Sequence, residues 1–241
     1  MRGFIVLLAM VGTVSAAAAV RAQGGRTETS GAQTTPLAPR DIVDLVESGA
    51  VEIRTAGSGI DSVTVEIRKL VDGPIVVRIP VGSFFVSASA AAQNMVATGA
   101  RTITLATKDW RTVSVPTACA NRPRDIPESG DTFTVARSPS QADLAQLMPV
   151  LEKAKATYAG RQAAVWIVTD NADYDDLGIL VESTTGFGGT RVINEAQTAR
   201  AMKLCEDAGI DITRKAIWSD RARMLSGLAP GATKTWLAAR Q

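Results

Sequence analysis

The sequence contains no histidine, and this absence removes several familiar kinds of catalytic site. A serine–histidine–aspartate triad, a cysteine–histidine pair and the usual catalytic zinc site all require an imidazole side chain. With only two cysteines in 241 residues, a four-thiolate metal site within one chain is excluded as well. The composition therefore argues against the commonest hydrolase machinery, and we expect a protein that is not an enzyme.

An excess of charge of one sign is also lacking. The 26 lysine and arginine residues nearly balance the 24 acidic residues, which leaves a net charge of +2. The basic residues are scattered along the chain and are not interleaved with aromatic residues. Proteins that bind nucleic acid through its phosphates usually concentrate their basic residues on one face. We therefore expect no nucleic-acid partner.

The N-terminus has the features of a secretory signal peptide. Arg2 precedes an apolar run at 4–14, and small residues follow up to Ala22. A charged start, a short apolar stretch and a small-residue end are what a signal peptidase reads, and this run is too short to span a bilayer. We predict a signal peptide over 1–22, with cleavage after Ala18 as the alternative. The protein is then secreted or periplasmic and has no membrane span after cleavage.

The next segments predict a linker and then a β-rich domain. Residues 23–40 are rich in Gly, Thr, Ser, Gln and Pro, which is typical of a disordered linker. Residues 41–49 predict one or two helical turns that end at Gly49. Alternation of apolar and polar residues then predicts short strands at 51–54, 63–68, 75–80, 83–86, 101–105 and 112–115. Strands of this length, separated by Gly and Pro turns, favour an antiparallel β-sandwich over 41–118.

The pattern changes after Cys119, and residues 119–237 predict a compact helical unit. A Pro-rich loop at 121–131 and a short strand at 133–135 come first. Helices are then expected from a cap at Ser138 or Ser140 to Tyr158, after which Gly160 breaks the helix. Further helices are expected at 161–169, 174–181, 194–208 and within 213–227. The predicted fold class is α+β, with the sandwich followed by the helical subdomain.

One pair of segments points to a specific chemistry. Gln162 opens an apolar helix and Trp166 follows four residues later, so both side chains lie on one helix face. Cys119 stands at the end of a strand, before an Asn-Arg-Pro loop. These features resemble the bacterial thioester domains of surface adhesins, which carry Cys after a strand and later Thr-Gln-x-Ala-(Ile/Val)-Trp at a helix start. The resemblance covers 119–170, and Arg161 stands where the family has Thr.

The resemblance implies that the Cys119 sulfur attacks the Gln162 carboxamide, releases ammonia and leaves an internal thioester. The function it implies is adhesion, in which an amine on a protein or surface ligand takes the acyl group and becomes covalently attached. The chemistry needs a thiolate, which is both a nucleophile and a good leaving group. It also needs an apolar cover that keeps water away from the bond. We expect Trp166 and Tyr158 to form this cover.

Two alternatives remain open at this point. In an oxidising compartment two cysteines most often form a disulfide, and a Cys119–Cys205 bond would give a non-covalent structural or binding module without a thioester. If Cys205 is instead a buried helix residue, Cys119 is left free. The other alternative is a secreted hydrolase that uses paired carboxylates, such as Asp44 with Glu47 or Asp109 with Glu66, although no spacing supports it.

Residues 171–182 partly match a calcium-binding loop. Asn171, Asp173, Asp175 and Glu182 fall at positions one, three, five and twelve, which supply oxygen ligands in such loops. Asp176 stands at position six, where the loop requires glycine. Calcium is the only cofactor that the sequence suggests. The alternative is an acidic helix N-terminus, where negative charge is stabilised by the helix dipole.

Overall fold

The computed structural model describes residues 37–137, 142–182 and 189–240. The predicted signal peptide at 1–22 and the helix caps proposed at Ser138 or Ser140 lie outside the described residues. Of the predicted linker at 23–40, only its last four residues are described, and Arg40 already belongs to strand β1 (Arg40–Asp41). The linker prediction therefore extends at least one residue too far, because β1 pairs in parallel with β4 (Ile75–Ile79).

The largest sheet has six antiparallel strands in the order β2-β3-β8-β6-β5-β9. Its strands are β2 (Val51–Gly57), β3 (Ser62–Lys69), β8 (Arg111–Ala120), β6 (Asn94–Ala97), β5 (Phe84–Ser87) and β9 (Phe133–Ala136). Burial alternates along β3, where Val63, Val65 and Ile67 are fully buried. The period-two pattern in the sequence thus reflects one face turned to the core, while β6 is a strand that the sequence did not predict.

The two outer strands of this sheet come together and nearly close it into a barrel. Thr55 in β2 donates its hydroxyl proton to the Phe133 carbonyl of β9 at 2.7 Å and accepts from the Phe133 N–H at 2.7 Å. The Gly57 N–H donates to the Asp131 carbonyl at 2.8 Å. The predicted sandwich is therefore not confirmed, because the six strands belong to one sheet that curls onto itself. Such closure leaves few exposed strand edges.

A second, three-stranded sheet has the order β1-β4-β7, with β7 at Arg101–Leu105. Helix α1 (Ile42–Glu47) follows β1, and its N-cap Asp41 accepts a hydrogen bond from the Val43 N–H at 2.8 Å. The chain turns away at Gly49, whose φ of 66° favours glycine. The short helix expected at 41–49 is therefore confirmed.

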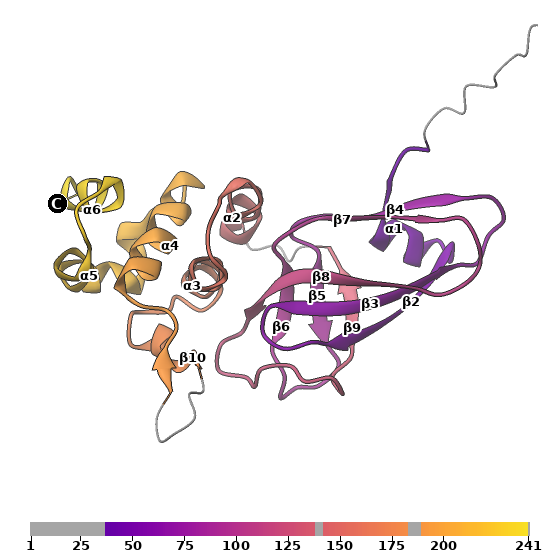
Figure 1. Cartoon of the computed structure of the whole chain (residues 1–241), viewed down its shortest axis with the longest axis horizontal. Helices are drawn as coiled ribbons and strands as arrows, with labels where there is room; N and C mark the ends of the chain where they lie inside the picture. Colours follow the sequence, from indigo (N-terminus) through magenta and orange to yellow (C-terminus); the bar gives the residue numbers. More distant parts are fainter. Residues whose placement is uncertain (1–36, 138–141, 183–188, 241) are drawn as a thin grey trace, which may run out of the picture. The chain divides into compact units, whose positions relative to one another are not determined.

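The second half of the chain is mainly helical, as predicted, so the α+β order of strands before helices is confirmed (Figure 1). Short elements connect the helices: η1 (Asp176–Ile179), β10 (Val181–Glu182), β11 (Thr190–Arg191), η2 (Ile212–Arg214) and η3 (Ala216–Asp220). The helices are α2 (Ala142–Lys153), α3 (Tyr158–Thr169), α4 (Glu195–Asp207), α5 (Arg221–Gly227) and α6 (Ala232–Ala238). Among the helices in the described ranges, none has both the length and the apolar character that a membrane crossing requires.

Two helix predictions are wrong. The helix expected to reach Tyr158 ends at Lys153, and Thr157 then caps a new helix in which Gly160 lies inside the first turn. Gly160 therefore does not break a helix, because the Thr157 hydroxyl accepts its N–H at 3.2 Å and begins α3. The helix expected at 174–181 is a single 3-10 turn followed by the short strand β10.

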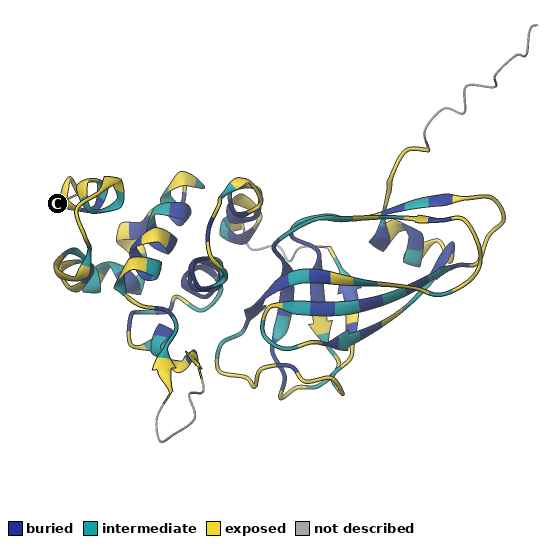
Figure 2. Ribbon diagram, viewed as in Figure 1, coloured by how far each residue is buried: buried dark blue, intermediate teal, exposed yellow. Residues whose placement is uncertain are grey.

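Helix α3 is the element that positions the candidate site. Nine of its twelve residues are buried (Figure 2). It packs against β8 and against α2 and α4, and residues 37–241 form one compact unit. A helix that is apolar nearly all round is typical of such a buried position.

Candidate thioester site

The structure brings Cys119 and Gln162 together. The Cys119 N–H donates to Gln162 Oε1 at 2.8 Å, and Gln162 Nε2 donates to the Cys119 carbonyl at 2.8 Å. Both residues have an exposed fraction of 0%. The carboxamide is thus paired with both main-chain polar groups of one residue, which fixes its position relative to the main chain of Cys119.

The end of β8 explains why this pairing forms. Strand β3 pairs with β8 only as far as Pro116, so the β3-facing edge of β8 is open at Cys119. On the other edge, Met95 of β6 lies opposite Cys119. Residues of an antiparallel strand direct their two main-chain groups alternately to one neighbour and to the other. The Gln162 carboxamide takes the place of the missing neighbour and satisfies two polar groups that would be buried without partners.

Helix α3 also brings the hydroxyl of Tyr158 into contact with the Gln162 carboxamide. Tyr158 and Gln162 are four residues apart and therefore share a helix face. The Tyr158 hydroxyl lies 3.2 Å from Gln162 Oε1 and 3.5 Å from the Ile60 carbonyl oxygen. Burial raises the pKa of Tyr158, so the hydroxyl keeps its proton and acts as a donor. Gln162 Oε1 is therefore within reach of two donors.

The Cys119 sulfur is enclosed by protein. Its Sγ lies 3.4 Å from Met95 Sδ and 3.8 Å from the Ile60 carbonyl oxygen. Burial raises the pKa of the Cys119 thiol to about 12. The sulfur is therefore protonated at neutral pH, and an attack on a neighbouring group requires that its proton be transferred during the reaction.

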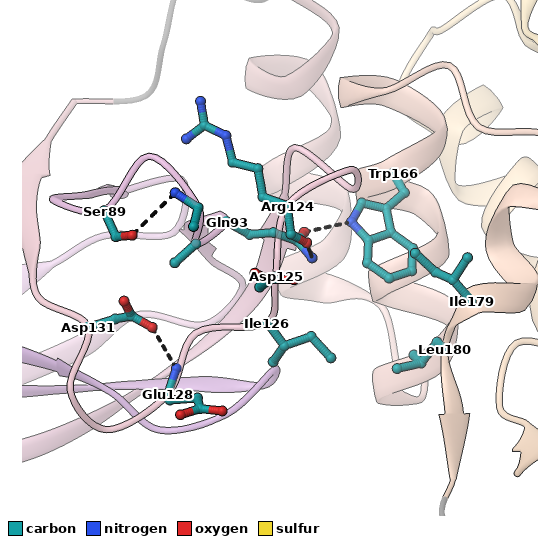
Figure 3. A pocket seen from close by; sticks show the side chains of 12 residues that line it. Ser89, Gln93, Arg124, Asp125, Ile126, Glu128, Asp131, Trp166, Ile179 and Leu180 are labelled. Atoms are coloured by element: carbon teal, nitrogen blue, oxygen red, sulfur yellow. Dashed lines mark hydrogen bonds between the residues drawn. The ribbon is translucent and has the colours of Figure 1, made fainter.

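Trp166 lies one helical turn beyond Gln162 and is buried. Its indole N–H points to Gln93 Oε1, at a donor–acceptor distance of 3.4 Å. Of the two predicted cover residues, Tyr158 contacts the carboxamide, while Trp166 forms part of the wall of a neighbouring cleft (Figure 3). Ile60 and Met95 contact the sulfur and were not identified from the sequence.

The cleft beside Trp166 has a volume of about 550 Å³. Figure 3 shows the Trp166 ring near the apolar side chains of Ile179 and Leu180, with Gln93 joined to the indole by a hydrogen bond. Much of the remaining wall comes from the 121–131 loop, including the polar residues Arg124, Asp125 and Glu128, and the rest comes from residues 89–92. Of the residues around this cleft, only the Pro-rich loop was noted in the sequence.

Cys119 and Cys205 are both free and buried, so the alternative with a disulfide between them is not what the structure contains. Cys119 lies beside Gln162, whereas Cys205 Sγ is 3.9 Å from the Ala164 carbonyl oxygen. Gln162 and Ala164 are two residues apart on α3, so they are separated by about 200° around the helix axis. The two cysteines therefore meet α3 on opposite sides, and the helix separates them.

The residues of the partial calcium-loop match are engaged elsewhere in the structure. Asn171 Oδ1 accepts from the Ala216 N–H at 3.0 Å, and Asp173 Oδ1 accepts from the Asp176 N–H at 2.8 Å. Asp175 pairs with an arginine of α5, and Glu182 is an exposed residue of β10. Within the described ranges, no group of three or more His, Cys, Asp or Glu residues is arranged to hold a metal ion. Asp173 and Asp176 flank the start of η1, as the acidic-terminus alternative expects.

Three of the four carboxylates considered for a hydrolase have other partners. Asp44 and Glu47 both form ion pairs with Arg137. Asp109 accepts a hydrogen bond from the Thr107 hydroxyl at 2.8 Å. No observation therefore favours glycoside chemistry at these residues.

No family model matches this chain, and searches of curated proteins and of solved structures found no match either. The candidate site is therefore defined by its own geometry, which pairs the buried residues Cys119 and Gln162 and places the partly buried Tyr158 beside them.

Proposed function

We propose that this protein is exported and forms an internal thioester between Cys119 and Gln162, through which it attaches covalently to an amine on a partner. The observation that carries the proposal is the pair of 2.8 Å hydrogen bonds between the Gln162 carboxamide and the main chain of Cys119. This function is adhesive rather than enzymatic, because the acyl group is used once and stays on the product.

The hydrogen-bonded pair supports bond formation because it holds the Gln162 carboxamide against the residue that carries the reacting sulfur. Both hydrogen bonds of the carboxamide go to the main chain of Cys119, the residue that carries the sulfur. The Ile60 carbonyl oxygen lies 3.8 Å from Cys119 Sγ and 3.5 Å from the Tyr158 hydroxyl, which in turn contacts Gln162 Oε1. Holding two reactants in such an arrangement removes most of the entropic cost of bringing them together.

Burial supports the lifetime of the bond. Cys119 and Gln162 are inaccessible to solvent, and Tyr158, Ile60 and Met95 contact them. A site without water prevents hydrolysis of a reactive acyl group. It follows that an amine must displace part of this cover before it reaches the thioester.

The attachment step uses only groups of the chain and its partner. The amine nitrogen adds to the Gln162 acyl carbon, the C–S bond breaks, and a proton from the amine goes to the sulfur. The products are an amide on the Gln162 side chain and a free Cys119 thiol. Lysine side chains and other primary amines on a protein or surface ligand fit this requirement. The predicted signal peptide supports an exported location, where such foreign amines are met.

A fluorescent primary amine tests the proposal. The chain beginning at residue 23 is incubated with dansyl-cadaverine, denatured and digested. We expect one label, on the peptide that contains Gln162, together with a newly free Cys119 thiol. The variant Cys205→Ala serves as the matched control and should label as the parent chain does. Absence of label, or equal label in Cys119→Ala, contradicts the proposal.

A further inference from the structure

Two hydrogen-bond donors converge on one oxygen of the candidate site. Gln162 Oε1 accepts from the Cys119 N–H at 2.8 Å and from the Tyr158 hydroxyl at 3.2 Å. The donors come from different elements, the strand β8 and the first residue of the helix α3. A carbonyl oxygen has two lone pairs, so this one has a donor for each.

The same oxygen carries the charge that develops during thioester chemistry. When sulfur or an amine adds to the acyl carbon, the carbonyl electrons move onto the oxygen and form a tetrahedral oxyanion. Donors already aimed at that oxygen stabilise the intermediate without any reorganisation. In a site that excludes water, this stabilisation is larger than it is in solution.

We propose that the Tyr158 hydroxyl and the Cys119 N–H form an oxyanion-binding pair that accelerates both the formation of the thioester and its opening by an amine. Tyr158 is then a catalytic residue as well as part of the cover. This inference rests on the proposed thioester, and it adds a chemical role to a residue that the sequence suggested only as shielding.

The formation step balances without any further reactant. The Cys119 sulfur bonds to the Gln162 carbon, and the oxyanion forms between the two donors. Collapse of the intermediate breaks the C–N bond, and the thiol proton leaves with the nitrogen as ammonia. When an amine opens the bond, the same oxyanion forms again, the C–S bond breaks, and the proton released by the amine restores the thiol.

The surroundings of Tyr158 suit a donor. Its hydroxyl has one proton and two acceptors within reach, of which Gln162 Oε1 at 3.2 Å is closer than the Ile60 carbonyl at 3.5 Å. Thr157 caps the helix directly before Tyr158 and holds the first turn in place. The tyrosine is therefore fixed at the position where the charge develops.

Replacement of the hydroxyl provides the test. Tyr158→Phe is produced unfolded and allowed to fold while intact mass records the loss of ammonia. Methylamine is then added and the rate of its incorporation is measured. Loss of one oxyanion donor lowers a rate by about 100-fold, and we expect a decrease of at least about 10-fold in both steps because the Cys119 N–H remains. The sequence holds only two tyrosines, and Tyr174→Phe is the matched control, which should leave both rates unchanged.

A second variant keeps the inference testable if Tyr158→Phe does not fold. In a Tyr174→Phe background, ring-fluorinated tyrosine enters the chain only at position 158 and makes that hydroxyl a stronger donor with little change in shape. Faster thioester formation and faster opening support the inference. Rates equal to those with ordinary tyrosine, or a Tyr158→Phe chain that reacts like the parent, overturn it while the thioester itself stands. A parent chain that never loses ammonia overturns the proposed function and this inference with it.

Discussion

Replacing Gln162 by glutamate probes the hydrogen bonds between Gln162 and Cys119, on which the proposed thioester depends. The substitution Gln162→Glu keeps the side-chain shape and exchanges Nε2 for oxygen. It is made together with Cys119→Ala, so that neither the variant nor its Cys119→Ala reference forms a thioester. In its protonated form, the introduced carboxyl group can still donate to the main-chain carbonyl of residue 119 and accept from the N–H. In its ionised form it faces that carbonyl with a negative charge.

The expected effect follows from burial. Residue 162 is fully buried, and burial of this kind raises the pKa of a carboxyl group by about 3 to 5 units. With about 3 units, at about 1.4 kcal/mol each, the free energy of unfolding changes by about 4 kcal/mol. Because the pKa in the folded chain lies above the unfolded value of about 4.3, the stability is fully present below about pH 4 and is lost as the pH rises through the folded pKa.

Urea unfolding of the double variant and of Cys119→Ala is measured at several pH values. The difference between the two free energies of unfolding at each pH is the effect of Gln162→Glu. We expect the two chains to have similar stability near pH 4 and to diverge by about 4 kcal/mol near pH 8. The Cys119→Ala reference removes the pH dependence that the two chains share. A difference that stays constant to within about 0.5 kcal/mol would refute a buried carboxamide at position 162.

Three further predictions concern the two cysteines and the closure of the six-stranded sheet. In denaturant the parent chain should show one reactive thiol, from Cys205, and a second after methylamine treatment, whereas no reactive thiol would indicate the disulfide. In the folded chain Cys205 should resist alkylation near pH 8, because burial raises its pKa to about 12; rapid alkylation without unfolding contradicts this. Thr55→Val should lower the free energy of unfolding by about 1 to 3 kcal/mol, because both main-chain groups of Phe133 lose their buried partner. Thr104→Val, at an exposed position of β7, is the control, and an equal effect of both substitutions argues against barrel closure through Thr55.

The sequence predicted the order of strands and helices because that order depends on local periodicity. Alternation in β3 and the helix end at Gly49 are visible in a few consecutive residues. The closure of the barrel was not predictable, because it depends on hydrogen bonds between Thr55 and Phe133, 78 residues apart. A sandwich and a nearly closed barrel require the same pattern along each strand, and the pattern alone does not choose between them.

The candidate site was predictable where a motif marked it. Cys119 and Gln162 were singled out by a resemblance, and Tyr158 was suggested only as part of the cover. Its place on the helix face of Gln162 was not predicted, because the sequence analysis put Tyr158 at the end of the preceding helix, whereas it is the first residue of α3. Ile60 and Met95 contact the sulfur from distant segments, and no sequence signal marks them. The spacing of the calcium pattern does not report what its oxygens bind, and Asp173 Oδ1 accepts a hydrogen bond from the Asp176 N–H at the start of η1.

Thioester formation is decided by the intact mass of the chain beginning at residue 23, taken under denaturing and non-reducing conditions. A Cys119–Gln162 thioester predicts a mass lower by one ammonia than that of the unmodified sequence. After methylamine treatment the mass should equal that of the unmodified sequence with its amide nitrogen carrying one methyl group, and Cys119→Ala should show neither change. The unmodified mass before and after methylamine, in a folded chain, would contradict the claim.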